Sequence, residues 1–318
     1  MTHRGLDEAS MGKASRTKVE STRREKIAAQ RAAERKAEKR RRILLASGSV
    51  VVVLVIVLVF VIVKLNNKPA PSTAQGLSNG PTGSALAAVV DKVTSVPAST
   101  LDTVGAGGGA VTGKPGSISG TTLTANGKPE MLYIGAEYCP YCAAERWAMI
   151  VALSRFGTFK GLATVHSAVT NGAGDKEPDP NTPTWTFVHS SYSSPYLTFT
   201  PVEETTNIPD PSTGSYTLLQ TPTAAQQALV TKYVGSQGSI PFIDFGNKYL
   251  ISGVSYDPGV LGGLSWATIA TDLSNPNSAV AKAVDGTANY LTAAICKMTG
   301  NQPASACTST VQSLESGL

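Results

Sequence analysis

Residues 131–156 read MLYIGAEYCPYCAAERWAMIVALSRF, and they are the natural starting point for interpreting this chain. The apolar run Met131–Gly135 follows a turn-forming Asn-Gly pair, which predicts a buried strand. After the motif CPYC, apolar residues recur with helical spacing from Ala143 to Phe156 and predict a helix. Cys139 and Cys142 are therefore expected where a strand ends and a helix begins.

This position suits thiol chemistry. A helix N-terminus carries a partial positive charge and free N–H groups, so a thiolate at Cys139 should be stabilised and its pKa should fall below ~8.5. Pro140 fits a first helical turn, where a missing N–H costs nothing. Cys139, the more exposed thiol, would attack a substrate disulfide, and Cys142 would then resolve the mixed disulfide.

Two structural explanations compete with this interpretation. A CxxC pair can be half of a zinc site, or it can form an inert disulfide. The other cysteines, Cys296 and Cys307, have ten residues between them, and the histidines are only His3, His166 and His189. We therefore expect neither a metal nor another cofactor.

A second motif lies far downstream, where GSIPFIDF at 238–245 precedes a Gly-Asn-Lys turn and a further apolar strand at 249–253. A proline that opens a strand of a hairpin resembles the thioredoxin-like fold, whose characteristic cis-proline faces the CxxC. The resemblance implies that Pro241 is cis. It also implies that the backbone of Ile240 pairs with an extended substrate peptide.

The motif CPYC is also similar to that of glutaredoxins. Four longer segments, which begin at residues 135, 221, 238 and 287, resemble an uncharacterised family of membrane-anchored thioredoxin-like proteins, domain of unknown function 929. The resemblance implies an α/β, thioredoxin-like fold with a long insert at about 169–238 before the cis-proline hairpin. A C-terminal helical extension and one N-terminal transmembrane helix would complete it.

The residues around the cysteines complete the expected site. Tyr138 stands where thioredoxins usually have tryptophan. Together with Pro140, Tyr141, Ile240 and Pro241, it forms the predicted substrate-binding set.

Nearby charges should also act on the dithiol. The carboxylates of Glu137 and Glu145 would raise the pKa of Cys139, against the helix dipole, and Arg146 would offset them.

The insert and the C-terminus carry further predictions. Residues 185–188 and 196–199 are expected to be two short strands joined by a Ser-rich turn, and residues 223–234 a helix. The insert could cover the site or only pack beside it. An amphipathic helix is expected over about 278–298, ending at a glycine C-cap.

Four cysteines allow three pairings, and local spacing favours 139–142 and 296–307. A structural disulfide between Cys296 and Cys307 would pin the C-terminal helix. The alternative is a second redox pair that relays electrons to the first.

The N-terminal segment predicts a membrane anchor. Residues 1–42 hold 14 of the 27 Lys and Arg residues, and an uncharged run of 21 residues follows at 43–63. A cleaved signal would be shorter, and basic residues before the span keep the N-terminus in the cytoplasm. We expect a cytoplasmic tail (1–42), a single span through the lipid bilayer (43–63), an extracytoplasmic linker (64–104) and a thioredoxin-like domain (105–318).

These features favour a membrane-anchored extracytoplasmic thiol–disulfide oxidoreductase. Its partners would be exported proteins with thiols or disulfides, together with a redox partner that the sequence does not identify. Nucleic acid is not expected, because no basic patch lies outside the tail. The alternatives are a non-catalytic thioredoxin-like binding or assembly module with a structural CxxC disulfide, and a sensor whose basic tail signals inward.

Overall fold

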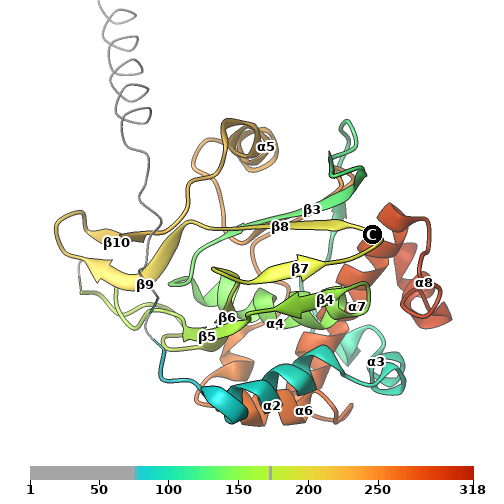
Figure 1. Ribbon diagram of the computed structural model, residues 1–318, viewed down its shortest axis with the longest axis horizontal. Coiled ribbons are helices and arrows are strands. Elements are labelled where there is room, and N and C mark those ends of the chain that lie inside the picture. Colours follow the sequence, from blue (N-terminus) through green and yellow to red (C-terminus); the bar gives the residue numbers. More distant parts are fainter. Residues whose placement is uncertain (1–75, 77, 172–173) are drawn as a thin grey trace, which may run out of the picture. The chain divides into compact units, whose positions relative to one another are not determined.

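A computed structural model (Figure 1) describes residue 76 and residues 78–171 and 174–318. The predicted basic tail (1–42) and membrane span (43–63) lie outside these residues. Within the described residues, no helix has the length and apolar character needed to cross a bilayer.

A mixed sheet forms the centre of the domain around strand β3 (Lys128–Gly135). On one side β3 pairs in parallel with β8 (Thr198–Glu203), and on the other it pairs antiparallel with β11 (Phe242–Phe245). Next come β12 (Tyr249–Ser252) and the short edge strand β1 (Gly116–Ser117). Strand β2 (Thr124–Ala125) forms a hairpin with the start of β3.

Helices cover both faces of this sheet, because β3 is apolar on both sides. Leu132 and Ile134 pack in one cluster with Val230 of helix α5 (Ala224–Val234), whereas Met131 and Tyr133 join the larger core on the opposite face. Figure 1 shows α5 on one side of β3 and β8, and α4 and α7 on the other.

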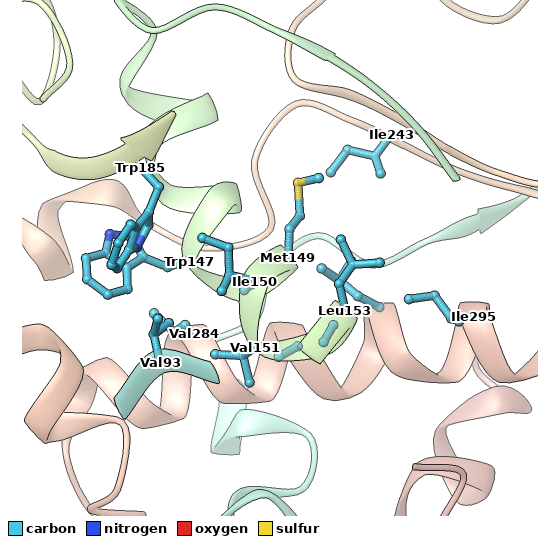
Figure 2. Close-up of a cluster of buried hydrophobic side chains, with 14 of the residues drawn as sticks. Val93, Trp147, Met149, Ile150, Val151, Leu153, Trp185, Ile243, Val284 and Ile295 are labelled. Carbon is cyan, nitrogen blue, oxygen red and sulfur yellow. The ribbon is translucent and has the colours of Figure 1, made fainter. Parts of the chain in front are cut away.

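Helix α4 (Pro140–Ser154) begins within the CPYC motif and runs through the larger core. Figure 2 shows it among side chains of the sheet, of α2 and of α7, which include Ile243, Val93 and Val284. The sequence predicts one apolar face for this helix, but almost all of its residues are buried. A helix that other elements surround on every side needs apolar or paired residues all round.

The remaining elements surround this centre. Three antiparallel pairs, β4–β7, β5–β6 and β9–β10, lie outside the main sheet. Their bounds are Thr158–Lys160 (β4), Ala163–His166 (β5), Pro183–Thr186 (β6), Ser191–Ser193 (β7), Thr205–Asp210 (β9) and Ser215–Leu218 (β10). The other helices are α2 (Gly83–Thr94), α3 (Ala98–Val104), η1 (Gly107–Gly109), η2 (Pro258–Leu261), α6 (Trp266–Asp272), α7 (Ala279–Thr299) and α8 (Ser309–Glu315).

The predicted pairing within the insert is wrong. Strand β6 pairs with β5, whereas β8 pairs with β3, so the strands expected at 185–188 and 196–199 do not form a hairpin with each other. The reason is burial: Phe199 packs in the larger core and Val202 in the smaller one, so β8 needs cover on both faces. The expected insert at 169–238 therefore supplies a central strand.

The predicted linker (64–104) also extends too far. Helices α2 and α3 lie within it, yet their residues Val93 and Leu101 are buried in the larger core. After α3, the backbone at Gly107 packs closely against the backbone of α7 at Gly286. A Cβ added to Gly286 would lie only 2.7 Å from the Cα of Gly107. These N-terminal helices therefore belong to the folded domain.

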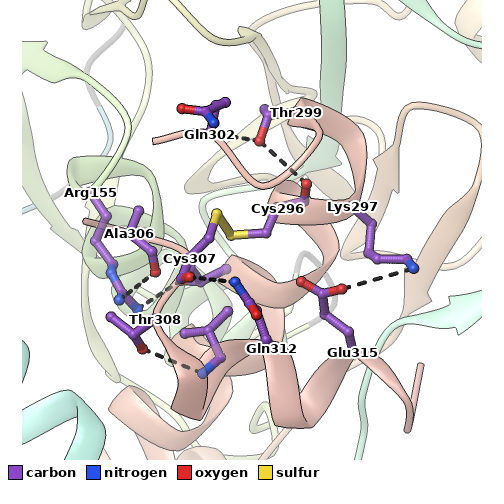
Figure 3. The surroundings of a disulfide bond; sticks show 12 residues. Arg155, Cys296, Lys297, Thr299, Gln302, Ala306, Cys307, Thr308, Gln312 and Glu315 are labelled. Carbon is purple, nitrogen blue, oxygen red and sulfur yellow. Dashed lines mark hydrogen bonds and ion pairs between the residues drawn. A yellow bond between two sulfur atoms is a disulfide. The ribbon is translucent and has the colours of Figure 1, made fainter. Parts of the chain in front are cut away.

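The C-terminal predictions are confirmed. Helix α7 begins after its N-cap Ser278 and ends at Gly300, which adopts the left-handed conformation that favours glycine. A disulfide joins Cys296 of α7 to Cys307 in the loop before α8 (Figure 3). Arg155, at the end of α4, donates a 2.7 Å hydrogen bond to the carbonyl of the neighbouring Ala306.

Candidate functional site: a buried dithiol at the start of α4

The two cysteines of the CPYC motif occupy the first turn of α4. Cys139 is the N-cap residue, and its sulfur accepts a hydrogen bond from the backbone N–H of Cys142 at 3.4 Å. Pro140 fills the first helical position, as predicted. Both cysteines are free thiols, and Cys139 is 4% exposed whereas Cys142 is fully buried. The predicted order of exposure holds, but the site is more enclosed than the motif alone suggests.

The surroundings make the two thiols unequal. The Cys142 thiol, as a hydrogen-bond donor, lowers the pKa of Cys139; burial opposes this, and backbone N–H groups and the charge of Arg146 assist it. Burial, followed by the hydrogen bond to Cys139, raises the pKa of Cys142 well above its usual value. The raising effect expected from Glu137 and Glu145 on Cys139 does not prevail, because the net shift is downward.

A buried ion pair lies beneath the dithiol. Arg146, one turn after Cys142, donates from Nε and Nη2 to the two carboxylate oxygens of Glu203, at 2.8 and 2.6 Å. Nη2 also donates to the carbonyl of Ala136 at 2.7 Å, and both charged side chains are fully buried. Glu203 thus holds the guanidinium group in place, and the charge of Arg146 acts on Cys139 in a medium that screens it weakly.

A third ionisable group, Glu137, completes this buried cluster. Its side chain is 1% exposed, and burial raises its pKa to about 7, with an opposing hydrogen bond from Thr186. Its backbone N–H donates to Thr205 of β9 at 2.9 Å. The carboxyl group can therefore gain or lose a proton near neutral pH, two residues before Cys139.

Gly135 allows the sheet to approach the second thiol. A Cβ at this position would lie 2.1 Å from the Tyr133 hydroxyl oxygen and 3.0 Å from the Cys142 sulfur. Any side chain at position 135 would displace either the Tyr133 hydroxyl or the Cys142 sulfur. Tyr133 is fully buried, with the Arg146 guanidinium 5.8 Å from the centre of its ring.

The predicted proline stands on the neighbouring strand. The Ile240–Pro241 peptide is cis, as the resemblance implies. Phe242, the next residue, pairs with Ile134 of β3, so Pro241 lies beside the end of the strand that leads to the dithiol.

A cleft of about 430 Å³ opens at this place. Its lining includes Tyr138 and Ile240, two of the predicted substrate-binding residues, together with Glu204. The ring of Tyr138 stacks on Tyr216 of β10, with ring centres 4.2 Å apart. The cleft therefore brings together residues from four separate parts of the chain.

The remaining predicted residues fall into two places. Tyr141, in the CPYC motif, is 38% exposed and joins Val169 and Leu218 as a large apolar side chain open to solvent. Cys296 and Cys307 form their own disulfide at the end of α7. Glu203, Glu204 and Tyr216 were not predicted, because nothing in their local sequence indicates that the insert reaches the dithiol.

The unequal thiols lead to a direct expectation. In the reduced protein, an alkylating agent should modify Cys139 with an apparent pKa below the free-thiol value of ~8.5, and Cys142 much more slowly. The measurement is the pH dependence of alkylation, read for each cysteine by mass spectrometry. An apparent pKa for Cys139 at or above that of a free thiol would contradict the assignment.

Comparisons with known proteins locate the chain among families. A family model described as a domain of unknown function (DUF929) matches residues 114–297, a segment that contains the dithiol, the ion pair and the cleft. Neither the curated proteins nor the solved structures gave a match.

Proposed function

The chain belongs to the DUF929 family, whose description assigns no activity, and we propose that its CPYC motif makes it a thiol–disulfide oxidoreductase. The observation that carries the proposal is the inequality of the two thiols. Cys139 caps a helix and has a lowered pKa, whereas Cys142 is buried with a raised one. A structural disulfide has no use for a stabilised thiolate.

We further propose that the fold is thioredoxin-like. Three features support this: the strand β3 that leads into CxxC and helix α4, the parallel neighbour β8, and the proline before the antiparallel hairpin β11–β12. In such a fold the proline faces the dithiol, which agrees with the pairing of Phe242 and Ile134.

The reaction begins with the thiolate of Cys139. It attacks one sulfur of a substrate disulfide, forms a mixed disulfide, and releases the other substrate sulfur as a thiolate that takes up a proton. Cys142 then loses its proton and attacks the Cys139 sulfur, which closes the 139–142 disulfide and releases the second substrate thiol. Two electrons pass from the dithiol to the substrate, and the reverse sequence oxidises a substrate dithiol.

The buried groups assist these steps. Arg146 favours a thiolate at Cys139, since its charge lowers the pKa of that thiol. Glu137, with a pKa of about 7, is a candidate acceptor for protons that leave the site. The reaction as proposed uses no cofactor. A second protein with a dithiol or a disulfide must therefore restore the starting redox state of the 139–142 pair.

We place the domain outside the cell membrane, anchored by residues 43–63. The support is the uncharged run of 21 residues after a basic tail. The substrates would then be exported proteins with thiols or disulfides.

One observation favours the non-catalytic binding module as a second candidate: Cys139 is only 4% exposed. A substrate sulfur can reach the Cys139 sulfur only if the residues that surround Cys139 move apart.

A trapping experiment separates the two functions. Cys142→Ser should accumulate a mixed disulfide between Cys139 and a disulfide-bonded peptide, because the resolving thiol is missing. The matched variant Cys139→Ser should accumulate none. The measurement is intact mass before and after reduction with dithiothreitol. If neither variant forms an adduct, the oxidoreductase proposal fails and the binding module gains.

A further inference from the structure

The cleft beside the dithiol has a lining that points to a particular substrate. Its floor is apolar, formed by Ile134, Val230 and Phe242, which also belong to the smaller core cluster. Its rim is polar and includes Glu204 and Gln227. A long side chain with an aliphatic stem and a charged end matches both parts.

Glu204 supplies the negative charge. It follows Glu203, and successive residues of an extended chain point to opposite faces. Glu203 therefore turns inward to Arg146, while Glu204 lines the cleft on the face covered by α5. In the described part of the chain, no Lys, Arg or His forms an ion pair with Glu204. Burial disfavours the charged form of this carboxyl group and so raises its pKa. A cation beside the group would stabilise the charged form.

Tyr138 adds a second attraction for a cation. Tyr138 lines the cleft together with Glu204. Burial is the main cause that raises the pKa of its hydroxyl, and negative charges contribute in the order Cys139, Cys142, Glu177 and Glu204. Glu177 also accepts a hydrogen bond from the hydroxyl of Tyr216, on which Tyr138 stacks. An aromatic ring that lines a cleft beside a carboxylate attracts a cation through its π face, and the carboxylate of Glu204 adds its charge.

The position of the cleft relates this cation to the reacting sulfur. Tyr138 directly precedes Cys139, and Ile240 directly precedes the proline on the neighbouring strand. A substrate chain whose sulfur reaches Cys139 places its adjacent residues within about 3–7 Å of it along an extended backbone. The side chains of those residues are therefore within reach of the cleft, which Tyr138 and Ile240 line.

We propose that this cleft binds the side chain of a lysine or arginine next to the reactive cysteine of the substrate. The inference rests on the proposed function for its biological meaning, since it names the substrates on which the dithiol acts. These are thiol or disulfide proteins with a basic residue beside the cysteine.

The test uses three disulfide-linked peptides that are identical except for Lys, Gln or Glu beside the cysteine. The wild-type protein should show kcat/KM values in the order Lys, Gln, Glu, with about a fivefold step for each unit of charge. The preference should shrink as salt is added. Equal values for the three peptides would overturn the inference while leaving the oxidoreductase activity in place.

Two variants assign the preference to one carboxylate. Glu204→Gln should lower the Lys-to-Glu ratio, and Glu204→Lys should invert it. Asp91→Asn, on the exposed side of α2, removes a carboxylate outside the cleft and should keep the wild-type ratio. A Glu204→Lys protein that still prefers the Lys peptide would refute the role of Glu204.

A binding assay tests the cleft separately from the chemistry. The same three peptides, with serine in place of cysteine, are titrated into the protein and followed by the tyrosine and tryptophan fluorescence. Tighter binding of the Lys peptide supports the inference about the cleft, whether or not any disulfide peptide is reduced. The absence of reduction would count only against the proposed oxidoreductase activity. Equal affinities together with equal rates would refute it.

Discussion

Replacing Arg146 with methionine is expected to lower the free energy of unfolding by about 3–5 kcal/mol, because it leaves the Glu203 carboxylate buried without its partner. Both side chains of this pair are fully buried, and Arg146 donates to both carboxylate oxygens. Urea unfolding measures the loss. The same variant should raise the apparent pKa of Cys139, since the guanidinium charge helps to lower it.

The double variant Arg146→Met/Glu203→Met is the matched control. It removes both charges and keeps the volume of the site nearly constant, so most of the lost stability should return. A double variant as unstable as the single one would show that packing or the hydrogen bond to Ala136, rather than the uncompensated charge, causes the loss.

Asp285 should make the protein less stable as the pH rises from about 4 to 8. Its side chain is fully buried in α7, and neither carboxyl oxygen has a hydrogen-bond partner among the described residues. Burial raises its pKa from 3.8 to about 8. Below pH 3.8 both the folded and the unfolded protein hold this proton. Above it only the unfolded chain loses the proton, so stability falls by roughly 1.4 kcal/mol per pH unit until the folded group ionises.

Asp285→Asn removes this contribution. The variant should gain stability over the wild type as the pH increases from 4 to 8, as measured by urea unfolding at several pH values. Glu145, with a pKa raised by burial to about 7, contributes in the same direction, so the variant keeps part of the slope. Asp91→Asn serves as an exposed control with no such gain. Parallel curves for wild type and Asp285→Asn would contradict the proposed ionisation.

Local patterns predicted the elements that carry the cysteines. The strand before CPYC, the helix after it and the capped helix α7 each depend on residues within a few positions, such as Pro140, Ser278 and Gly300. The disulfide between Cys296 and Cys307 followed from short spacing. These signals are strong because propensity, capping and burial agree over one short segment.

The pairing of β8 with β3 could not be read in the same way. Its apolar residues indicate a strand, but a strand does not indicate its partner when the two are separated by more than 60 residues. Glu203 and Glu204 were absent from the predicted site for the same reason, because they lie more than 50 residues after the CPYC motif in the sequence. A charged pair such as Arg146 and Glu203 looks solvent-exposed until the fold brings the two side chains together.

The contact between Gly107 and Gly286 has a practical consequence for anyone who expresses this domain. The family match covers residues 114–297, and a recombinant fragment cut at those limits would omit Gly107, both N-terminal helices and Cys307. The apolar surfaces of α4 and α6 that α2 now covers, and the surface of α7 that α3 covers, would face water, and Cys296 would become an unpaired thiol. The folded unit is therefore larger than the segment that the family model matches, and a fragment that begins near residue 76 and keeps the C-terminus is the appropriate starting material.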